Sequence, residues 1–248
     1  MSDMKIRLIV PILFFLSSCN LRHDHPDAFV IHGQIKNCPP GKIYLEEVDI
    51  SDIHRIDSSS VDNEGKFTFS YKPEAPGFYL LKMHDGRYVD LLLQKNEEVS
   101  FTGDYKKIPK EYLISGSPGS LLLKEFYNHS NKNRAKADSL TDLLHKHQYD
   151  DDYYQLTLAF DDIFGKIWED QKSYERSFID QHPGSLATLL VLNYAFGPRP
   201  VLSEEDDWAY YKKVDSVLMI RYPTNKHVLY HHKRIAKVMK GSSEGVRE

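Results

Sequence analysis

The spacing of apolar residues changes once along the chain, and this change constrains the fold more than any other feature of the sequence. From Phe29 to Ser115 apolar and polar residues alternate in short runs separated by turn residues. In the clearest run Phe67, Phe69 and Tyr71 share one face, as a half-buried strand requires. We expect strands at 29–35, 42–47, 53–61, 67–71, 78–83, 88–94, 99–103 and 112–115. About eight short strands with regular turn signals predict an antiparallel β-sandwich or barrel.

The alternation ends at the sequence Ser-Gly-Ser-Pro-Gly-Ser, residues 115–120, and helical spacing follows. Ser117 can accept a backbone hydrogen bond as N-cap, and Pro118 suits the first helical position because no N–H is needed there. One apolar stripe comprises Leu156, Phe160, Ile163, Phe164 and Ile167, and another comprises Trp208, Tyr211, Val214 and Leu218. The sequence therefore predicts an α+β protein, in which the sandwich or barrel precedes a C-terminal α-helical domain.

The first 19 residues have the anatomy of an export signal with a site for a lipid. Lys5 and Arg7 precede an apolar run that is about half as long as the roughly 20 residues of a membrane-spanning helix. The sequence Leu-Ser-Ser-Cys that ends at Cys19 resembles the bacterial lipobox, whose cysteine is lipidated and becomes the new N-terminus. We expect Cys19 to anchor the protein in the cell envelope, on the periplasmic face of the outer membrane. An ordinary secretory signal with a cysteine nearby is the alternative.

These patterns divide the chain into a signal peptide (1–18), a tether (19–27), a β-domain (28–116), an α-helical domain (117–240) and a tail (241–248). Cleavage before Cys19 would leave 30 basic and 35 acidic residues, because Lys5, Arg7 and Asp3 are removed. This negative balance suggests no nucleic-acid partner. With Cys19 lipidated, Cys38 is the only remaining cysteine, so the chain has neither an intrachain disulfide nor a Cys-x-x-Cys motif.

Several short motifs resemble one known domain. They are Phe29-Val30-Ile31-His32-Gly33-Gln34-Ile35, Lys42-Ile43-Tyr44-Leu45, Ile56-Asp57-Ser58, Gly65-Lys66-Phe67-Thr68-Phe69, Pro76-Gly77-Phe78-Tyr79 and Ile114-Ser115-Gly116-Ser117. Their order and spacing resemble the N-terminal DUF4369-type domain of Bacteroidetes-type envelope lipoproteins. In those proteins a helical segment follows, to which His182-Pro183-Gly184-Ser185 and Arg221-Tyr222-Pro223 look similar.

The resemblance also implies what comes after the helices. In such lipoproteins a thioredoxin-like domain of the thiol-disulfide oxidoreductase kind (TlpA, AhpC/TSA) usually follows, whereas this sequence ends at Glu248. No position matches the active-site cysteines of that domain. We therefore expect a non-enzymatic binding or docking module, whose partners are the membrane, through the lipid, and another envelope protein or a thioredoxin-like protein. The alternative is a truncated or split thiol-disulfide oxidoreductase that lacks its redox domain.

The candidates for chemistry are few, and we expect no cofactor and no catalytic constellation. His227 and His231 are four residues apart on one predicted helix, as a pair of metal ligands would be, with His232 beside them. A third ligand is not evident, and a packed or solvated helix surface is the alternative. A hydrolase or metalloenzyme would rest on these histidines alone.

Three further features have simpler explanations than a site. Ser117 and Ser120 invite comparison with a nucleophile elbow, but helix capping explains them. Cys38 lies in a loop and is either an incidental thiol or a partner in a mixed disulfide. The run 150–152 of three aspartates precedes a predicted helix, where negative charge complements the helix dipole.

Overall fold

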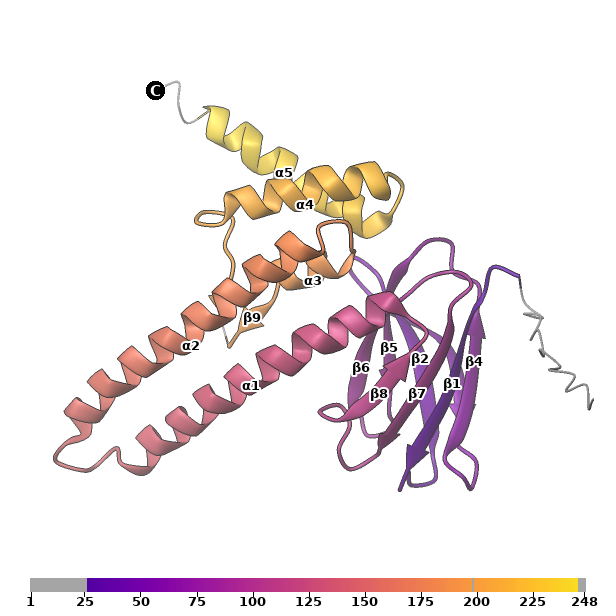
Figure 1. The fold of residues 1–248 in the computed structure, drawn as a ribbon, viewed down its shortest axis with the longest axis horizontal. Coiled ribbons are helices and arrows are strands. Elements are labelled where there is room, and N and C mark those ends of the chain that lie inside the picture. The colour runs from indigo at the N-terminus through magenta and orange to yellow at the C-terminus, as the bar shows by residue number, and fades with distance from the viewer. Residues whose placement is uncertain (1–25, 198, 245–248) are drawn as a thin grey trace, which may run out of the picture.

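The alternating half of the chain forms eight strands in two sheets (Figure 1). The computed structural model describes residues 26–197 and 199–244. The strands are β1 (Phe29–Lys36), β2 (Lys42–Val48), β3 (Ile53–Ser60), β4 (Lys66–Tyr71), β5 (Gly77–Lys82), β6 (Tyr88–Leu93), β7 (Glu98–Asp104) and β8 (Tyr112–Ser115). All the predicted strands are confirmed, with small differences at their ends.

The two sheets have the strand orders β4-β1-β7-β8 and β3-β2-β5-β6. They pack against each other without closing, so the sandwich is confirmed and the barrel is wrong. β1 pairs antiparallel with β4 but parallel with β7, so that Ile31 lies opposite both Phe69 and Val99. The expectation of a purely antiparallel sandwich is therefore wrong at this pair. Parallel neighbours need a long connection, here β2 to β6, which local sequence patterns do not reveal.

The core between the sheets consists of the residues that the alternation assigns to one face. Phe67 and Phe69 on β4 are 4% and 1% exposed. Phe29 packs edge-on against Tyr79 of the opposite sheet, with ring centroids 5.1 Å apart. Fully burying one such aromatic side chain contributes about 1.5–3 kcal/mol. The alternation therefore accounts for both the strand pattern and the composition of the sandwich core.

A tight turn connects β3 of one sheet to β4 of the other. Asp62 Oδ1 accepts hydrogen bonds from the N–H groups of Glu64 and Lys66, each at 2.8 Å. Gly65 has a φ of +79°, and a Cβ there would lie 2.1 Å from the Ile35 carbonyl oxygen. Only glycine fits this position without displacing β1.

The second half of the chain is helical. Its elements are α1 (Pro118–Lys146), α2 (Tyr153–Gln181), α3 (Ala187–Leu192), the short strands β9 (Ala195–Phe196) and β10 (Arg199–Pro200), α4 (Trp208–Arg221) and α5 (Lys226–Glu244). The N-cap of α1 is confirmed, because Ser117 Oγ accepts a hydrogen bond from the Ser120 N–H at 3.3 Å. The sequence did not predict β9 and β10, and α5 extends into the segment expected to be a tail. Within the described residues, no helix is long and apolar enough to cross a membrane.

The helices have their own core, to which the sandwich contributes two side chains. Leu218 and Val214 of α4 are fully buried, in agreement with the predicted stripe, and Phe178 of α2 is 3% exposed. Leu92 of β6 and Phe78 of β5 point out of the sandwich and pack into this cluster. The sandwich and the helices are thus two cores in contact, connected through the outer face of one sheet.

The far half of the α1–α2 hairpin projects away from the sandwich (Figure 1). We call residues 138–166 the arm, and none of its side chains is buried. The predicted stripe on α2 is helical, but only Ile167, just beyond the arm, is buried, whereas Ile163 is 43% exposed. The arm therefore carries apolar residues that the rest of the described chain does not cover.

Candidate functional site

The start of α1 is bonded to the edge strand β6, and the candidate site lies beside this attachment. Ser117 Oγ donates to the Leu92 carbonyl oxygen at 2.9 Å, and the Leu92 N–H donates to Ser120 Oγ at 3.1 Å. A Cβ on Gly119 would lie 2.6 Å from Leu92 Cγ, so glycine permits this close approach. Both hydroxyls are buried and hydrogen-bonded to the backbone, which explains the two serines as capping and attachment residues.

A groove of about 360 Å³ opens between α1 and the edges of the two sheets. We call it the Asp90 groove. It is lined by Arg87, Tyr88, Val89 and Asp90 from β6 and the turn before it, by Pro109 and Tyr112, and by Lys124, Tyr127, Asn128 and Asn131 from α1. Its volume lies within the range of small-molecule sites, about 300–1,000 Å³.

Asp90 is the one acidic residue among those that line this groove. Burial raises the pKa of its carboxyl group, although hydrogen bonds from the Tyr127 hydroxyl and from its own backbone oppose that shift. Asp90 has no ion pair with any described residue. The nearby Arg87 guanidinium is already engaged, because it binds Asp85 at 2.7 Å and donates to the Ile108 carbonyl oxygen at 2.6 Å. A carboxyl group removed from water and lacking a cation is costly, so a ligand that donates hydrogen bonds to it would bind favourably.

Three polar side chains of α1 in the Asp90 groove have no hydrogen bond or ion pair with any described residue. The side-chain amides of Asn128 and Asn131 are exposed and hydrogen-bond to no described residue. The Lys124 ammonium lies 5.3 Å from the centroid of the Tyr112 ring and forms no ion pair there. Burial, followed by the charge of Asp90, raises the pKa values of Tyr112 and Tyr127, so both remain protonated donors. The groove therefore presents donors, an acceptor and aromatic surface to one small volume.

A second groove, about 280 Å³, lies between the sandwich and α5 and contains the two histidines predicted as metal ligands. His227 packs edge-on against Phe78, with ring centroids 5.1 Å apart, and its buried Nε2 has no hydrogen-bond partner among the described residues. His231 Nε2 donates to the Tyr211 carbonyl oxygen at 3.2 Å. Burial lowers the pKa of each histidine, so both rings are neutral near pH 7.

The arrangement does not bring a third ligand to these histidines. Among the described residues, no group of three or more His, Cys, Asp or Glu side chains could hold a metal ion. His232 points elsewhere and pairs with Asp215 at 3.0 Å. The structure thus gives each histidine a packing or hydrogen-bonding role on the helix surface.

A third groove, about 470 Å³, brings together the two helical motifs that the resemblance singled out. The loop 182–185, Arg221 and Tyr222 form one wall, while Glu97 and Gln94 from the sandwich form the other. Burial raises the pKa of Glu97, against hydrogen bonds from Ser117 and from the Gln94 backbone. A Cβ on Gly184 would lie 2.7 Å from Arg221 Nη1, so this glycine lets the guanidinium cross the loop. Both motifs therefore position the contact between the two cores.

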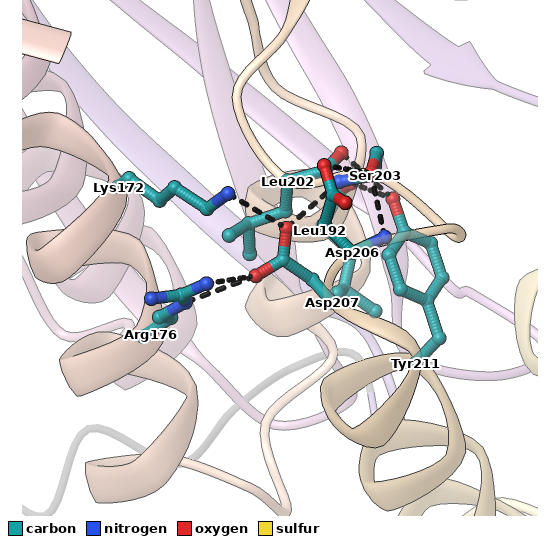
Figure 2. Close-up of polar contacts among 8 residues, drawn as sticks. All are labelled: Lys172, Arg176, Leu192, Leu202, Ser203, Asp206, Asp207 and Tyr211. Atoms are coloured by element: carbon teal, nitrogen blue, oxygen red, sulfur yellow. Dashed lines mark hydrogen bonds and ion pairs between the residues drawn. The ribbon is translucent and has the colours of Figure 1, made fainter. Parts of the chain in front are cut away.

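Asp207 forms a buried charged cluster that sequence reasoning missed (Figure 2). Its carboxylate accepts hydrogen bonds from Arg176 at 2.6 Å and from the Ser203 N–H at 3.1 Å, and it lies 3.4 Å from Lys172 Nζ. Burial alone would raise the pKa of Asp207, but the Arg176 and Ser203 hydrogen bonds and the Lys172 charge lower it. The side chain has no solvent exposure and its acceptors are occupied, so the cluster joins α2 to the start of α4 and leaves no free group for chemistry.

The Tyr211 hydroxyl lies beside the Asp207 cluster, between two backbone segments (Figure 2). It contacts the carbonyl oxygens of Leu192 and Leu202 at 2.9 and 3.0 Å. This links the end of α3 to the loop before α4. In the sequence, Tyr211 is one residue of an apolar helical stripe. Such a stripe predicts that the ring is buried, but it does not predict this hydrogen bond.

Cys38 is partly buried against the core of the sandwich. Burial, and then the charge of Asp85, raises the pKa of its thiol. A reactive cysteine needs the opposite shift, because the thiolate is the nucleophile. Its surroundings therefore favour the incidental thiol over a reactive one.

Two other predictions concern the N-terminal segment and the aspartates before α2. The signal peptide, Cys19 and most of the tether lie outside the described residues. Asp152 is the residue before α2 but forms no side-chain capping bond, while Asp150 pairs with His147 at 2.7 Å. The aspartates therefore precede the helix as predicted, without a capping hydrogen bond from Asp152.

Asp90 was also missed at the level of sequence, although a signal for it exists. It is the one acid within the strand Tyr-Val-Asp-Leu-Leu-Leu of β6. A charged residue in an otherwise apolar strand is either paired or functional. The sequence alone does not show that α1 covers this strand.

Comparisons with known proteins concern the β-domain alone. No curated protein and no solved structure matches the chain. Residues 29–122 match the family model described as Domain of unknown function (DUF4369). This stretch, which runs from β1 into the first turns of α1, is therefore similar to the DUF4369 domain.

Proposed function

We propose that the protein is a membrane-anchored envelope lipoprotein that acts as a non-catalytic binding module, with the Asp90 groove as its ligand site. One observation carries the proposal. In that groove a carboxyl group without a cation, an ammonium group and two amides face the same volume and have no mutual partners. Asp90 keeps acceptor capacity beyond its bond from Tyr127, and the donors beside it have no partner among the described residues, so this concave set of polar groups favours a bound polar ligand.

The chemistry of the groove favours a neutral ligand rich in hydroxyl groups, such as a sugar unit. Asp90 would repel an anion, and Lys124 would repel a cation. A hydroxyl group can donate to Asp90 and accept from Lys124 or from an amide, because it is both donor and acceptor. The exposed Tyr88 ring offers an apolar face for the C–H surface of a sugar ring.

Saturation-transfer NMR tests the ligand class on the soluble chain lacking residues 1–19. The probes are cellobiose, lactose, mannobiose and chitobiose at millimolar concentration. We expect transfer to at least one of them, and at least ten-fold weaker binding in Asp90→Asn and Asn131→Ala. Asp52→Asn, an exposed acid on the β2–β3 turn, is the matched control. Failure of all four probes, or equal binding in the groove variants, would contradict the proposal.

The membrane anchor is supported by the short apolar run and the Leu-Ser-Ser-Cys sequence that ends at Cys19. Two or more acyl chains, at about 0.8 kcal/mol per buried CH₂, make attachment stable. Cys19→Ala should abolish incorporation of labelled palmitate and signal processing. Continued labelling in that variant would show that the lipid is elsewhere.

A further inference from the structure

The arm, residues 138–166 of the α1–α2 hairpin, has a surface that the described chain leaves uncovered. Its exposed apolar side chains include Leu143 at 44%, Tyr154 at 68%, Leu158 at 49% and Ile163 at 43%. A pair of antiparallel helices buries only the seam between them. A third helix laid along that seam would complete a three-helix bundle and cover the remaining apolar faces.

The base of the arm has a groove suited to an apolar or aromatic anchor. The groove, about 790 Å³, has an aromatic floor of Phe164 and Trp168 from α2 and Phe196 from β9. Its charged lining residues are Asp161, Asp162, Lys166, Glu169 and Arg199. The Phe196 ring centroid lies 6.1 Å from that of Phe164 and 6.0 Å from that of Trp168. Gly165 faces open space, since a Cβ there would meet no atom within 4 Å. An aromatic floor of this kind also attracts cations.

The charge of the arm indicates which kind of partner can bind to it. The arm has seven acidic residues and two basic ones, Lys146 and Lys166. Lys166 is already paired with Asp162 at 2.6 Å. The arm therefore presents apolar side chains within a strongly negative field, which attracts a positive surface and repels a negative one.

This charge distinguishes the possible occupants. A second copy of the arm would bring two negative fields together, and an anionic lipid surface would be repelled for the same reason. The tether is also disfavoured, because the described chain begins on the far side of the sandwich from the arm (Figure 1). We propose that the arm docks a basic amphipathic helix of a partner protein, which lays its apolar face on the hairpin seam and in the Phe164–Trp168–Phe196 groove.

The experiment uses the soluble chain lacking residues 1–19 and two synthetic 18-residue helical peptides with identical leucine patterns. One peptide has lysine at every polar position and the other has glutamate. We expect calorimetry at low salt to detect the lysine peptide only. The double variant Leu158→Ser/Ile163→Ser, and the triple variant that replaces residues 150–152 with asparagine, should each bind at least ten-fold more weakly.

Matched controls separate this surface from general attraction between opposite charges. Leu113→Ser/Ile220→Ser removes two even more exposed apolar residues outside the arm, at 69% and 85% exposure. A triple Glu→Gln variant at Glu74, Glu125 and Glu205 removes as much charge elsewhere. Both controls should bind like the unaltered chain. Equal weakening in arm and control variants would overturn the proposal.

Two further outcomes would assign the arm to another occupant and overturn the proposal. The first is a dimer in sedimentation that Leu158→Ser/Ile163→Ser dissociates, which would identify a second copy. The second is arm-dependent co-sedimentation with phosphatidylcholine vesicles, which would identify a lipid surface. Neither result bears on the Asp90 groove, so this inference and the proposed ligand site fail independently.

Discussion

At the scale of single residues, Glu175 gives the sharpest prediction. It is fully buried in α2, where Gln171 Nε2 donates to its Oε1 at 2.9 Å and Oε2 has no described partner. Burial, and to a lesser extent the charge of Asp207, raises the pKa of Glu175 to about 8, against the Gln171 hydrogen bond. The folded protein therefore keeps this proton over a pH range in which the unfolded chain loses it.

The consequence is a defined pH dependence of stability. Below about pH 4.3 the carboxyl group is protonated in both states, whereas between that pH and about 8 only the folded state retains the proton. The free energy of unfolding should fall as pH rises through this window, by up to about 1.4 kcal/mol per pH unit. In urea denaturation from pH 5 to 8, Glu175→Gln should lose this dependence and gain roughly 2–4 kcal/mol over the unaltered protein at pH 8.

The matched control for this prediction is Glu169→Gln, because Glu169 is exposed on the same helix. Its pH dependence should equal that of the unaltered protein. If Glu175→Gln also follows that curve, the carboxyl group is ionised in the folded protein and the assignment is wrong.

Cys38 gives a second prediction at this scale. Its raised thiol pKa and the lack of a Cys-x-x-Cys motif leave no activated thiolate and no resolving partner. The soluble chain lacking residues 1–19 should therefore reduce insulin, with dithiothreitol as electron source, at the background rate. Turnover above background that disappears in Cys38→Ser would favour the redox alternative instead.

The sequence was least informative about the burial and the partners of single side chains. Gln171 and Glu175 are four apart on a helix, a spacing typical of a solvated face, yet both are buried between helices. Asp207 follows four polar residues, and its ion pairs come from α2, about 30 positions earlier. Such pairs depend on which helices meet, and local patterns contain no information on that.

At the scale of elements, the sequence was most informative. Strand periodicity located all eight strands, because every one except β3 has side chains buried in the sandwich core. Helical periodicity located α2 and α4 but did not distinguish their surroundings. The stripe on α4 faces the helical core, whereas the stripe from Leu156 to Phe164 lies on the arm. Periodicity reports an amphipathic face, not whether the same chain covers it.

The start of α1 supports a prediction for one element. Ser117→Ala would remove the N-cap acceptor and the hydrogen bond to the Leu92 carbonyl oxygen. The loss of a capping hydroxyl costs about 1 kcal/mol, and the Leu92 carbonyl oxygen keeps Ser120 Oγ as a partner at 3.2 Å, so we expect a loss of about 1 kcal/mol. Chemical denaturation measures this change. Ser115→Ala, at an exposed serine of β8, should change stability by less than about 0.5 kcal/mol; equal effects would show that the cap is unimportant.

At the scale of the whole molecule, the order of the strands and the contact between the cores could not be predicted. The alternation places Phe78 and Leu92 on the outer face of their sheet, where a polar residue would be expected in an isolated sandwich. Both are apolar because the helices cover that face. The candidate site arises in the same way, since α1 and β6 form the Asp90 groove only once they meet.

The division into two cores predicts which fragment of the chain can fold by itself. Every buried residue of the sandwich core lies between Phe29 and Ile114, so residues 26–116 should fold alone and melt cooperatively. The fragment should be less stable than the full chain, because Phe78 and Leu92 lose their cover. Phe78→Ser/Leu92→Ser should improve its solubility without abolishing the transition. Calorimetry that shows no cooperative transition in either fragment would mean that the helices are needed for the sandwich core.

The central place of β1 has a mechanical consequence. Six residues of β1 are registered with β4 and seven with β7, so this strand is held on both sides. A pull on the chain before Ala28 acts along β1 and loads both hydrogen-bonded ladders at the same moment. An edge strand such as β8 would instead separate from a single neighbour. Tension that enters from the N-terminal side is therefore shared across the middle of a sheet, and the sandwich resists being pulled open from its N-terminal end.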